Sequence, residues 1–159
     1  MQKFYSRMME DGSQCITSYH GDEAEVVIPD RNVTILFDEL FAGHGEITSV
    51  RIPDTVTDLG EFLFDGCENL HHIDLPASLT SLWGYTFCRS GLEEITLPDQ
   101  LISIPPFAFK DCKNLKRVVC GKGMRKINGW AFSGCDQLEE VVHGPDVAVS
   151  PKAFSTGKS

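Results

Sequence analysis

The side chains that could do chemistry in this sequence are first of all its histidines, because imidazole serves both as a metal ligand and as a general base. His71 and His72 are adjacent. Adjacent residues of a strand point to opposite faces, and no second pair of histidines or carboxylates follows at a ligand spacing. His20, His44 and His143 fall in predicted turns. The histidines therefore predict no metal site.

The six cysteines are the next candidates, as metal ligands, nucleophiles or disulfide partners. Cys67, Cys112 and Cys135 occupy one slot of a repeated segment, and Cys120 takes a strand position that aliphatic residues fill elsewhere. Cysteine used in this way is a small buried hydrophobe, so free buried thiols are predicted. A bridge between Cys112 and Cys135, one repeat apart, is the alternative. The lack of a C-x-x-C pair argues against structural zinc.

Catalytic motifs are missing as well, since the sequence has neither a G-x-S-x-G nor an H-E-x-x-H segment. Gly157-Lys158-Ser159 resembles the end of a phosphate-binding loop, but Lys152 stands where the first glycine of such a loop belongs. No helix follows it either, because the sequence ends there. We therefore expect neither an enzyme nor a bound cofactor.

The elements that position these residues come from a segment repeated between Ile47 and Cys135. The repeats begin at Ile47, Leu70, Leu92 and Leu115, which are 23, 22 and 23 residues apart. A period in this range is the signature of a solenoid, in which one repeat cannot bury its apolar side chains alone. The sequence therefore predicts a stack of similar rungs.

Each repeat begins with a short strand, as the alternation of Ile73 and Leu75 around an outward Asp74 indicates. Pro76 ends this strand, because proline has no N–H to donate to the next rung. Two inward residues then follow three apart, such as Leu79 and Leu82, and a turn of helix or 3₁₀ closes the repeat. That turn carries a phenylalanine expected to join a continuous buried spine of Phe41, Phe64, Phe87, Phe109, Phe132 and Phe154.

The two ends of the chain depart from this repeat. Residues 1–22 hold two strand-like segments around Asp11-Gly12, a strong hairpin signal, and are predicted to be an N-terminal β-hairpin cap. Residues 23–159 are predicted to be the solenoid, with a degenerate first repeat over 23–46 and a decaying last one from Leu138. Together they predict about six rungs in one structural domain.

The full pattern, L-x-x-I-x-L/I-P-x-x-L-x-x-I-x-x-x-A-F-x-x-C, resembles the BspA-like class of leucine-rich repeats over roughly residues 23–154. It differs from the usual class in having proline where Asn or Cys follows the strand. The resemblance implies an α/β solenoid, a right-handed coil with one short parallel strand per 22–24-residue repeat and a parallel sheet on its concave face. It also implies proteins that are often bacterial surface or secreted adhesion modules, many without a defined partner.

Composition and charge exclude several kinds of partner. A net charge of −9 without any cluster of Lys and Arg argues against nucleic acid and anionic membranes. No apolar run approaches the roughly 18 residues that span a bilayer. The first residues show neither the apolar h-region nor the cleavage site of a signal peptide. The chain as given is therefore expected in the cytoplasm, or a signal was removed from it, although the family it resembles is often found at the cell surface.

The residues left for binding lie between the inward positions of the strands and should face the concave surface in columns. Neighbouring rungs carry opposite charge there, as at Arg51 and Asp74 or along Glu94, Arg117 and Glu140, and such pairs keep strands in register. One hypothesis is a solvated ladder that neutralises itself. The other is a ligand-binding face with a less polar centre at Thr96, Val119 and Val142. The predicted partner-binding set is Ser49, Arg51, His72, Asp74, Glu94, Thr96, Arg117, Val119, Glu140 and Val142.

A second column, two residues before the phenylalanine spine, consists of Phe62, Tyr85, Phe107 and Trp130, and should lie on the convex or lateral side. Stacking of aromatic rings between rungs explains it without any ligand. An exposed strip that binds a protein or a glycan is the alternative.

The function predicted from these features is a non-enzymatic protein-interaction or adhesion-type module that presents its concave sheet to a protein partner. The alternative is a structural or self-associating repeat protein, which would form a homodimer through an open C-terminal edge at residues 138–142. Glu139 and Glu140 would guard that edge against strand pairing.

Overall fold

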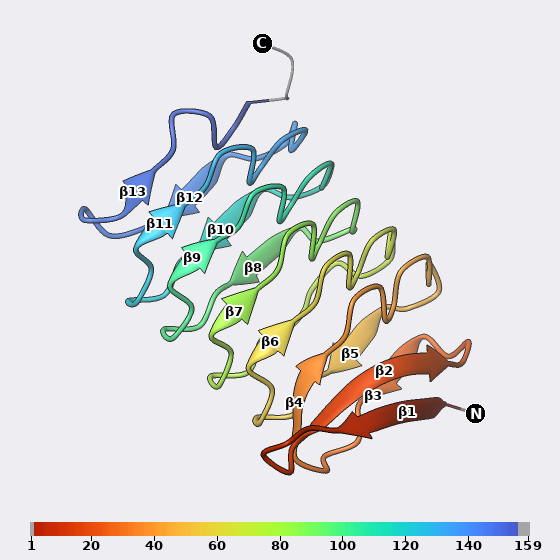
Figure 1. Cartoon of the computed structure of the whole chain (residues 1–159). Coiled ribbons are helices and arrows are strands. Elements are labelled where there is room, and N and C mark those ends of the chain that lie inside the picture. Colours follow the sequence, from red (N-terminus) through yellow and green to blue (C-terminus); the bar gives the residue numbers. More distant parts are fainter. Residues whose placement is uncertain (1, 156–159) are drawn as a thin grey trace.

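The computed structural model describes residues 2–155, which form a β-solenoid of about six turns (Figure 1). Strands β1 (Lys3–Met8) and β2 (Gln14–His20) lie at the N-terminal end of the coil, and β13 (Ala148–Val149) lies at the other end. The rungs stack in chain order between them, so each rung contacts mainly its two neighbours.

The N-terminal segment is an antiparallel hairpin of β1 and β2. Its turn is closed by a hydrogen bond of 2.8 Å from the Met9 amide to the Ser13 carbonyl, while the Ser13 amide donates to Asp11 at 2.9 Å. Gly12 has a φ of +87°, the left-handed conformation that such turns require and glycine adopts without strain. Strand β2 also pairs in parallel with β4 (Val33–Leu36), which places the hairpin directly against the first rung.

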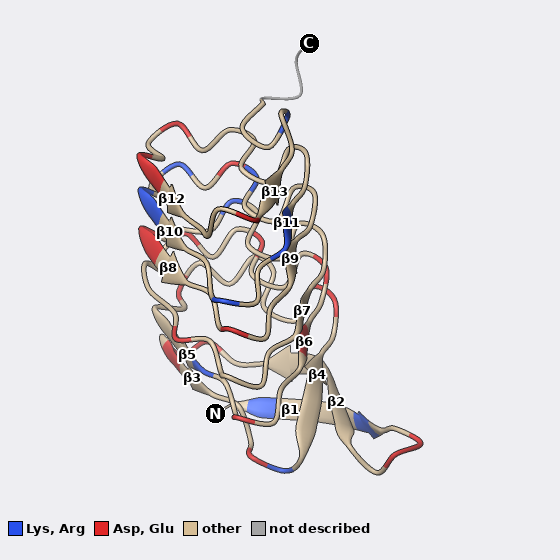
Figure 2. Ribbon diagram, turned by 90° about the vertical axis from the view of Figure 1, so that its left-hand side faces the viewer, with Lys and Arg blue, Asp and Glu red and all other residues tan. Residues whose placement is uncertain are grey.

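Most rungs contribute two short strands, where the sequence predicted one. The first face of the coil carries β3 (Glu25–Val27), β5 (Ser49–Arg51), β8 (Glu94–Thr96), β10 (Arg117–Val119) and β12 (Glu140–Val142). The second face carries β4, β6 (Asp58–Leu59), β7 (Ser81–Leu82), β9 (Ser103–Ile104), β11 (Lys126–Ile127) and β13. All pairings between rungs are parallel, and the two faces lie on opposite sides of the coil (Figure 2). Most second-face strands have two residues, too few for alternation to reveal them in the sequence.

The first face is interrupted at residues 71–75, where the predicted strand does not form. Strand β5 pairs only with β3, and β8 pairs only with β10, so the ladder has a gap between them. Within this gap the Glu93 amide donates to the His71 carbonyl at 3.0 Å, whereas the amides of residues 72–75 make no backbone hydrogen bond. The gap coincides with the 22-residue repeat, whose closing turn is one residue shorter than the others. Ile73 is nevertheless buried and Asp74 exposed, as the pattern predicted.

The expected turn of helix is absent from the part of the chain that the structure describes, so the architecture is a β-solenoid rather than an α/β fold. Rungs contain pairs of residues with positive φ, for example Tyr85 at 62° with Arg89 at 54°, and Trp130 at 61° with Gly134 at 78°. Residues in this left-handed region cannot continue a right-handed helix. The turn instead bonds to the next rung: the Phe64 amide, for example, donates to the Thr86 carbonyl at 2.9 Å.

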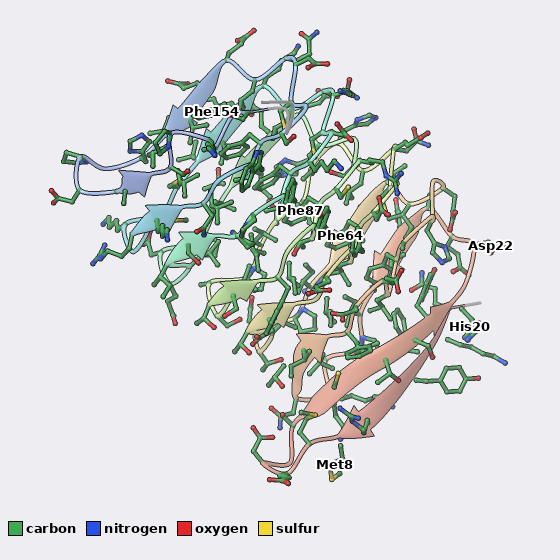
Figure 3. The ribbon with its side chains drawn as sticks, turned by 45° about the horizontal axis from the view of Figure 1, so that its top comes forward. Met8, His20, Asp22, Phe64, Phe87 and Phe154 are labelled. Atoms are coloured by element: carbon green, nitrogen blue, oxygen red, sulfur yellow. The ribbon has the colours of Figure 1, made fainter. Side chains whose placement is uncertain are left out.

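The core is a column of phenylalanine rings along the coil axis, as predicted. Successive rings from Phe41 to Phe154 lie 5.3–5.6 Å apart between centroids, at interplanar angles of 4–16°. Figure 3 shows Phe64 and Phe87 within the stack and Phe154 near its C-terminal end. The first five rings are buried, but Phe154 is 53% exposed because no described rung covers its outer side. The spine thus holds the rungs together and fixes which residues face outward.

Candidate functional site

The first face presents the predicted binding side chains to solvent. Each short strand buries its central residue, such as Val50, Ile95 or Val118, and turns the two flanking residues outward. The exposed members of the predicted set are Ser49, Arg51, His72, Asp74, Glu94, Thr96, Arg117 and Glu140, while Val119 and Val142 are half-buried. The alternation of a strand therefore places the eight that lie on β5, β8, β10 and β12 on one side of the backbone.

The structure brings six of these residues into one continuous patch. In β8, β10 and β12, Arg117 lies between Glu94 and Glu140, and Val119 lies between Thr96 and Val142. We call these six residues the β8–β12 patch. Ser49 and Arg51 lie on β5, beyond the interrupted segment that carries His72 and Asp74, and do not join the patch through strand pairing.

Charge alternates along the β8–β12 patch, which Figure 2 shows as red, blue and red strands in sequence. Arg117 Nε donates to Glu140 Oε1 at 2.8 Å, so one predicted opposite-charge pair forms. No ion pair joins Glu94 to Arg117 or Arg51 to Asp74. Asp74 instead contacts His72 at 3.1 Å. Exposed pairs of this kind contribute little, so the patch keeps charged groups available to a partner.

A second column of charged residues beside the patch also lacks ion pairs between rungs. Glu93, Lys116 and Glu139 alternate in charge from rung to rung, but no ion pair between them forms. Glu93 lies 3.3 Å from His71 Nδ1 instead. Because side chains of this length are exposed and their pairing costs conformational entropy, sequence order alone does not decide which ones meet.

A groove opens beside the gap in the first face. It has a volume of about 590 Å³ and is lined by His72, Asp74 and Thr96 of the predicted set, together with Leu75, Pro98 and Gln100. The sequence did not predict Leu75, Pro98 and Gln100 as site residues. The shortened 22-residue repeat is the one sequence feature that coincides with this groove.

The aromatic column forms a second surface feature on the coil. Phe62, Tyr85, Phe107 and Trp130 are half-buried and stack rung on rung, with centroid distances of 4.5, 4.9 and 5.8 Å. Lys110 Nζ lies 6.0 and 5.7 Å from the ring centroids of Tyr85 and Phe107, and Lys152 Nζ lies 5.4 Å from that of Trp130. Such contacts hold the cations over the rings. The stacking that the sequence suggested is therefore present, with two lysines beside it that the sequence did not suggest.

The six cysteines are free thiols, and three of them share one role in the turns. Cys67, Cys112 and Cys135 each direct Sγ at the phenylalanine carbonyl of the previous rung, at 3.2, 3.0 and 2.9 Å. Burial raises the pKa of the Cys67 thiol to about 12 and that of Cys120 to about 11. A hydrogen bond to Cys112, together with burial, raises the pKa of the Cys135 thiol. Thiols held protonated in this way are hydrogen-bond donors and poor nucleophiles.

Within residues 2–155, no three side chains of His, Cys, Asp or Glu meet in a group that could hold a metal ion. His71 Nδ1 lies 2.9 Å from the Gly91 carbonyl, while His72 contacts Asp74. The two adjacent histidines therefore have separate partners. The Gly157-Lys158-Ser159 segment lies outside the described residues.

The repeat that builds the rungs also matches a known protein family. Six copies of the BspA type leucine rich repeat region match residues 34–159. The chain belongs to the BspA-type leucine-rich repeat family. Members of this family are built on a scaffold that generally lacks catalytic activity. No protein with a curated description matches the chain.

Solved bacterial leucine-rich repeat proteins share the fold. A Treponema (T. pallidum) leucine rich repeat protein is 24% identical with a TM-score of 0.76, over 92% of this chain and 82% of its own. A leucine rich cell surface protein of Faecalibacterium prausnitzii is 20% identical with a TM-score of 0.63, over 87% of this chain and 52% of its own. The pneumococcal vaccine antigen PcpA is 19% identical with a TM-score of 0.75, over 91% and 39%. At these identities the likeness concerns the fold.

Two of these relatives are longer than this chain. This chain spans about half of the Faecalibacterium cell-surface protein and less of the pneumococcal antigen. Neither relative supports the expectation of a cytoplasmic location. No helix in residues 2–155 is long and apolar enough to cross a membrane.

Proposed function

We propose that this BspA-type chain is a non-enzymatic protein-interaction module that binds a protein partner on its first face, centred on the β8–β12 patch. One observation supports this most strongly: six outward side chains from three rungs lie in unbroken parallel register. Thr96, Val119 and Val142 form a less polar column, and Glu94, Arg117 and Glu140 form a column with charges of both signs beside it. A less polar contact area bordered by polar and charged groups is the usual anatomy of a protein interface.

The environment of the thiols supports the non-enzymatic part of this proposal. A nucleophilic cysteine needs a lowered pKa and an exposed sulfur. Cys67 is buried with a raised pKa, and its Sγ is occupied by the Phe41 carbonyl. Cys67 therefore supports a structural role in its turn.

We also infer that the β1–β2 hairpin serves as the N-terminal cap and belongs to one domain with the rungs. Ile16 and Tyr19 of β2 are buried, and the Tyr19 ring lies 5.2 Å from the ring of Phe41 at the start of the spine. A solenoid needs an atypical terminal unit to cover its first core side chains. The hairpin has the position and the buried residues for that role.

Charge reversal in the β8–β12 patch tests the binding proposal. The double variant Glu94→Lys/Arg117→Glu keeps the net charge of the chain but reverses the charge at two neighbouring positions of the patch. We therefore expect a protein from a surface extract to bind the variant at least about tenfold more weakly than the wild type, a loss of about 1.4 kcal/mol. The matched control is Lys126→Glu/Asp146→Lys, which also exchanges two exposed charges but lies elsewhere. Quantitative pull-down from bacterial and host surface extracts measures both variants. Equal capture by both would move the search to the aromatic column, where a protein or a glycan remains the candidate ligand.

Self-association through the C-terminal end is the second candidate, and the exposed end of the spine favours it. Phe154 is 53% exposed, and a hollow of about 430 Å³ lies between it and residues such as Leu138, Val141 and Val149. Glu139 and Glu140 flank this end and oppose indiscriminate strand pairing. A concentration-dependent dimer in light scattering that Phe154→Ser abolishes would support this candidate. A monomer at every concentration would remove it.

A further inference from the structure

A slot on the second face, close to the hairpin, has no role in the proposed interface. The residues that follow β4, β6 and β7 in successive rungs are Phe37, Gly60 and Trp83. Phe37 is 46% exposed and Trp83 is 52% exposed, so each ring offers much of its surface to solvent. The two residues are two rungs apart, about 9–10 Å at the usual strand spacing. The glycine between them leaves the space between the rings open.

Local packing explains why this middle position is glycine. A Cβ placed on Gly60 would lie 2.6 Å from both the backbone nitrogen and Oδ1 of Asp38. Asp38 Oδ1 also accepts a hydrogen bond from the Glu61 amide at 2.8 Å, so the carboxylate is held in place beside the glycine. The slot is therefore built by the backbone and does not depend on a side chain moving aside.

The slot has the size of a site for one side chain. Its volume is about 280 Å³, with buried Cys15 and Leu36 at its base, and Phe37, Trp83 and the hairpin residue Arg7 around it. Pockets for whole small-molecule ligands usually measure about 300–1,000 Å³. This one lies at the lower end of that range and opens to the surface, which suits a single protruding side chain from a larger partner.

Its charge is negative on balance. Asp38, Asp58 and Glu61 line the slot against one cation, Arg7. None of these three carboxylates forms an ion pair with another side chain in residues 2–155. Trp83 Nε1 donates to Asp58 Oδ2 at 3.2 Å, which orients the indole and places a carboxylate next to its ring. Two exposed aromatic rings beside unpaired carboxylates suit a cation, through cation–π attraction together with charge-assisted hydrogen bonds.

We propose that this slot binds an arginine or lysine side chain of a basic segment in a protein partner. The net charge of −9 would draw such a segment toward the chain, and the slot would seat one of its cationic groups between Phe37 and Trp83. The site lies on the face opposite the β8–β12 patch and is independent of the function proposed for that patch.

Tryptophan fluorescence can test this site, because the chain has two tryptophans and Trp130→Phe leaves Trp83 as the reporter. The probe is a hexa-arginine peptide blocked at both ends, titrated at fixed ionic strength, with hexa-glutamate as the opposite-charge probe. We expect saturable quenching by hexa-arginine alone, and about tenfold weaker binding after Asp38→Asn/Asp58→Asn. An asparagine oxygen at position 38 can still accept from the Glu61 amide, and one at position 58 can still accept from either Trp83 or Thr57, so most of the hydrogen bonds that these aspartates accept are kept.

The matched control is Asp54→Asn/Asp146→Asn, which removes the same two negative charges from exposed positions outside the slot. This pair should leave hexa-arginine binding unchanged. If both double variants weakened hexa-arginine binding equally, the overall charge would explain the effect and the proposal would be overturned. A free blocked arginine that binds as tightly as the peptide would overturn the assignment to a protein segment, and the absence of saturable quenching would overturn the site itself.

Discussion

At the residue scale, one thiol in each of three rungs helps to hold the turn against its neighbour. The Cys67 thiol donates to the Phe41 carbonyl, and Cys112 and Cys135 repeat the arrangement with Phe87 and Phe109. Each of these carbonyls also accepts a backbone amide of its own turn, so the thiol adds a second, weak hydrogen bond between rungs from a small apolar side chain. The sequence correctly predicted free thiols, and Cys67 and Cys112 are buried as expected while Cys120 and Cys135 are half-buried. It did not predict the bonds that the thiols make, because only the fold brings each sulfur to the preceding rung.

The raised pKa of Cys67 predicts a dependence of stability on pH. The folded thiol keeps its proton up to about 12, whereas the unfolded thiol loses it near its ordinary value of 9.0. Between these values the folded state binds more protons, so the free energy of unfolding is undiminished below pH 9 and falls as the pH rises toward 12. Urea denaturation at pH 7 and pH 10 gives the decrease in the free energy of unfolding between the two pH values. This decrease should be smaller for Cys67→Ser than for the wild type, because the serine hydroxyl does not titrate in this range. The same loss in both proteins would contradict this effect of the thiol.

The phenylalanine spine predicts a large effect of one truncation. Phe109 is fully buried between Phe87 and Phe132, so Phe109→Ala should lower the free energy of unfolding by about 3–5 kcal/mol. Denaturant titration by circular dichroism measures the change. The control is Lys122→Ala at an exposed position, expected within about 0.5 kcal/mol of the wild type. Similar losses in the two variants would mean that the inward and outward positions are wrongly assigned.

Lys110 shows where residue patterns mislead. It directly follows a buried spine phenylalanine, a position that the pattern of the repeat assigns to the surface, yet it is half-buried over the rings of Tyr85 and Phe107. Its long aliphatic stem can lie along apolar surface while the charge remains near solvent. A binary pattern of apolar and polar residues does not contain that information.

At the element scale, the gap in the first face predicts a local difference in hydrogen exchange. Amides of residues 72–75 make no backbone hydrogen bond, whereas β10 pairs on both sides with β8 and β12. Amides in the gap should therefore exchange markedly faster than those of Arg117–Val119, which are protected by the ladder. Hydrogen–deuterium exchange with peptide-level or NMR detection resolves the two segments. Equal protection would mean that the strand forms in solution after all.

The elements also show how far the repeat could be interpreted from sequence. The period, the spine from Phe41 to Phe132 and the outward positions followed from spacing and residue type, since the rungs before the last one bury the same columns. The missing helix did not follow, because positive φ at bulky residues such as Tyr85 and Trp130 has no local sequence signature. The second-face strands were also missed, because two residues such as Ser81–Leu82 carry no periodicity.

At the scale of the whole molecule, the coil separates surfaces with different chemistry. The first face carries the mixed-charge β8–β12 patch, and the second face carries the slot between Phe37 and Trp83. Because each rung mainly contacts its neighbours, a change on one surface should leave the other intact. Their site residues could be predicted only in part: the first face repeats a column, whereas the slot depends on a single glycine at position 60.

The central claim is that a protein partner binds at the first face. Its most direct test is hydrogen exchange of the chain in complex with a protein that binds the wild type but does not bind the Glu94→Lys/Arg117→Glu variant. The chain alone gives the reference rates. Added protection in β8, β10 and β12, with none in β9 and β11 on the second face, is the result that we predict. Protection confined to the second face or to the turns that carry Phe62, Tyr85, Phe107 and Trp130 would contradict it.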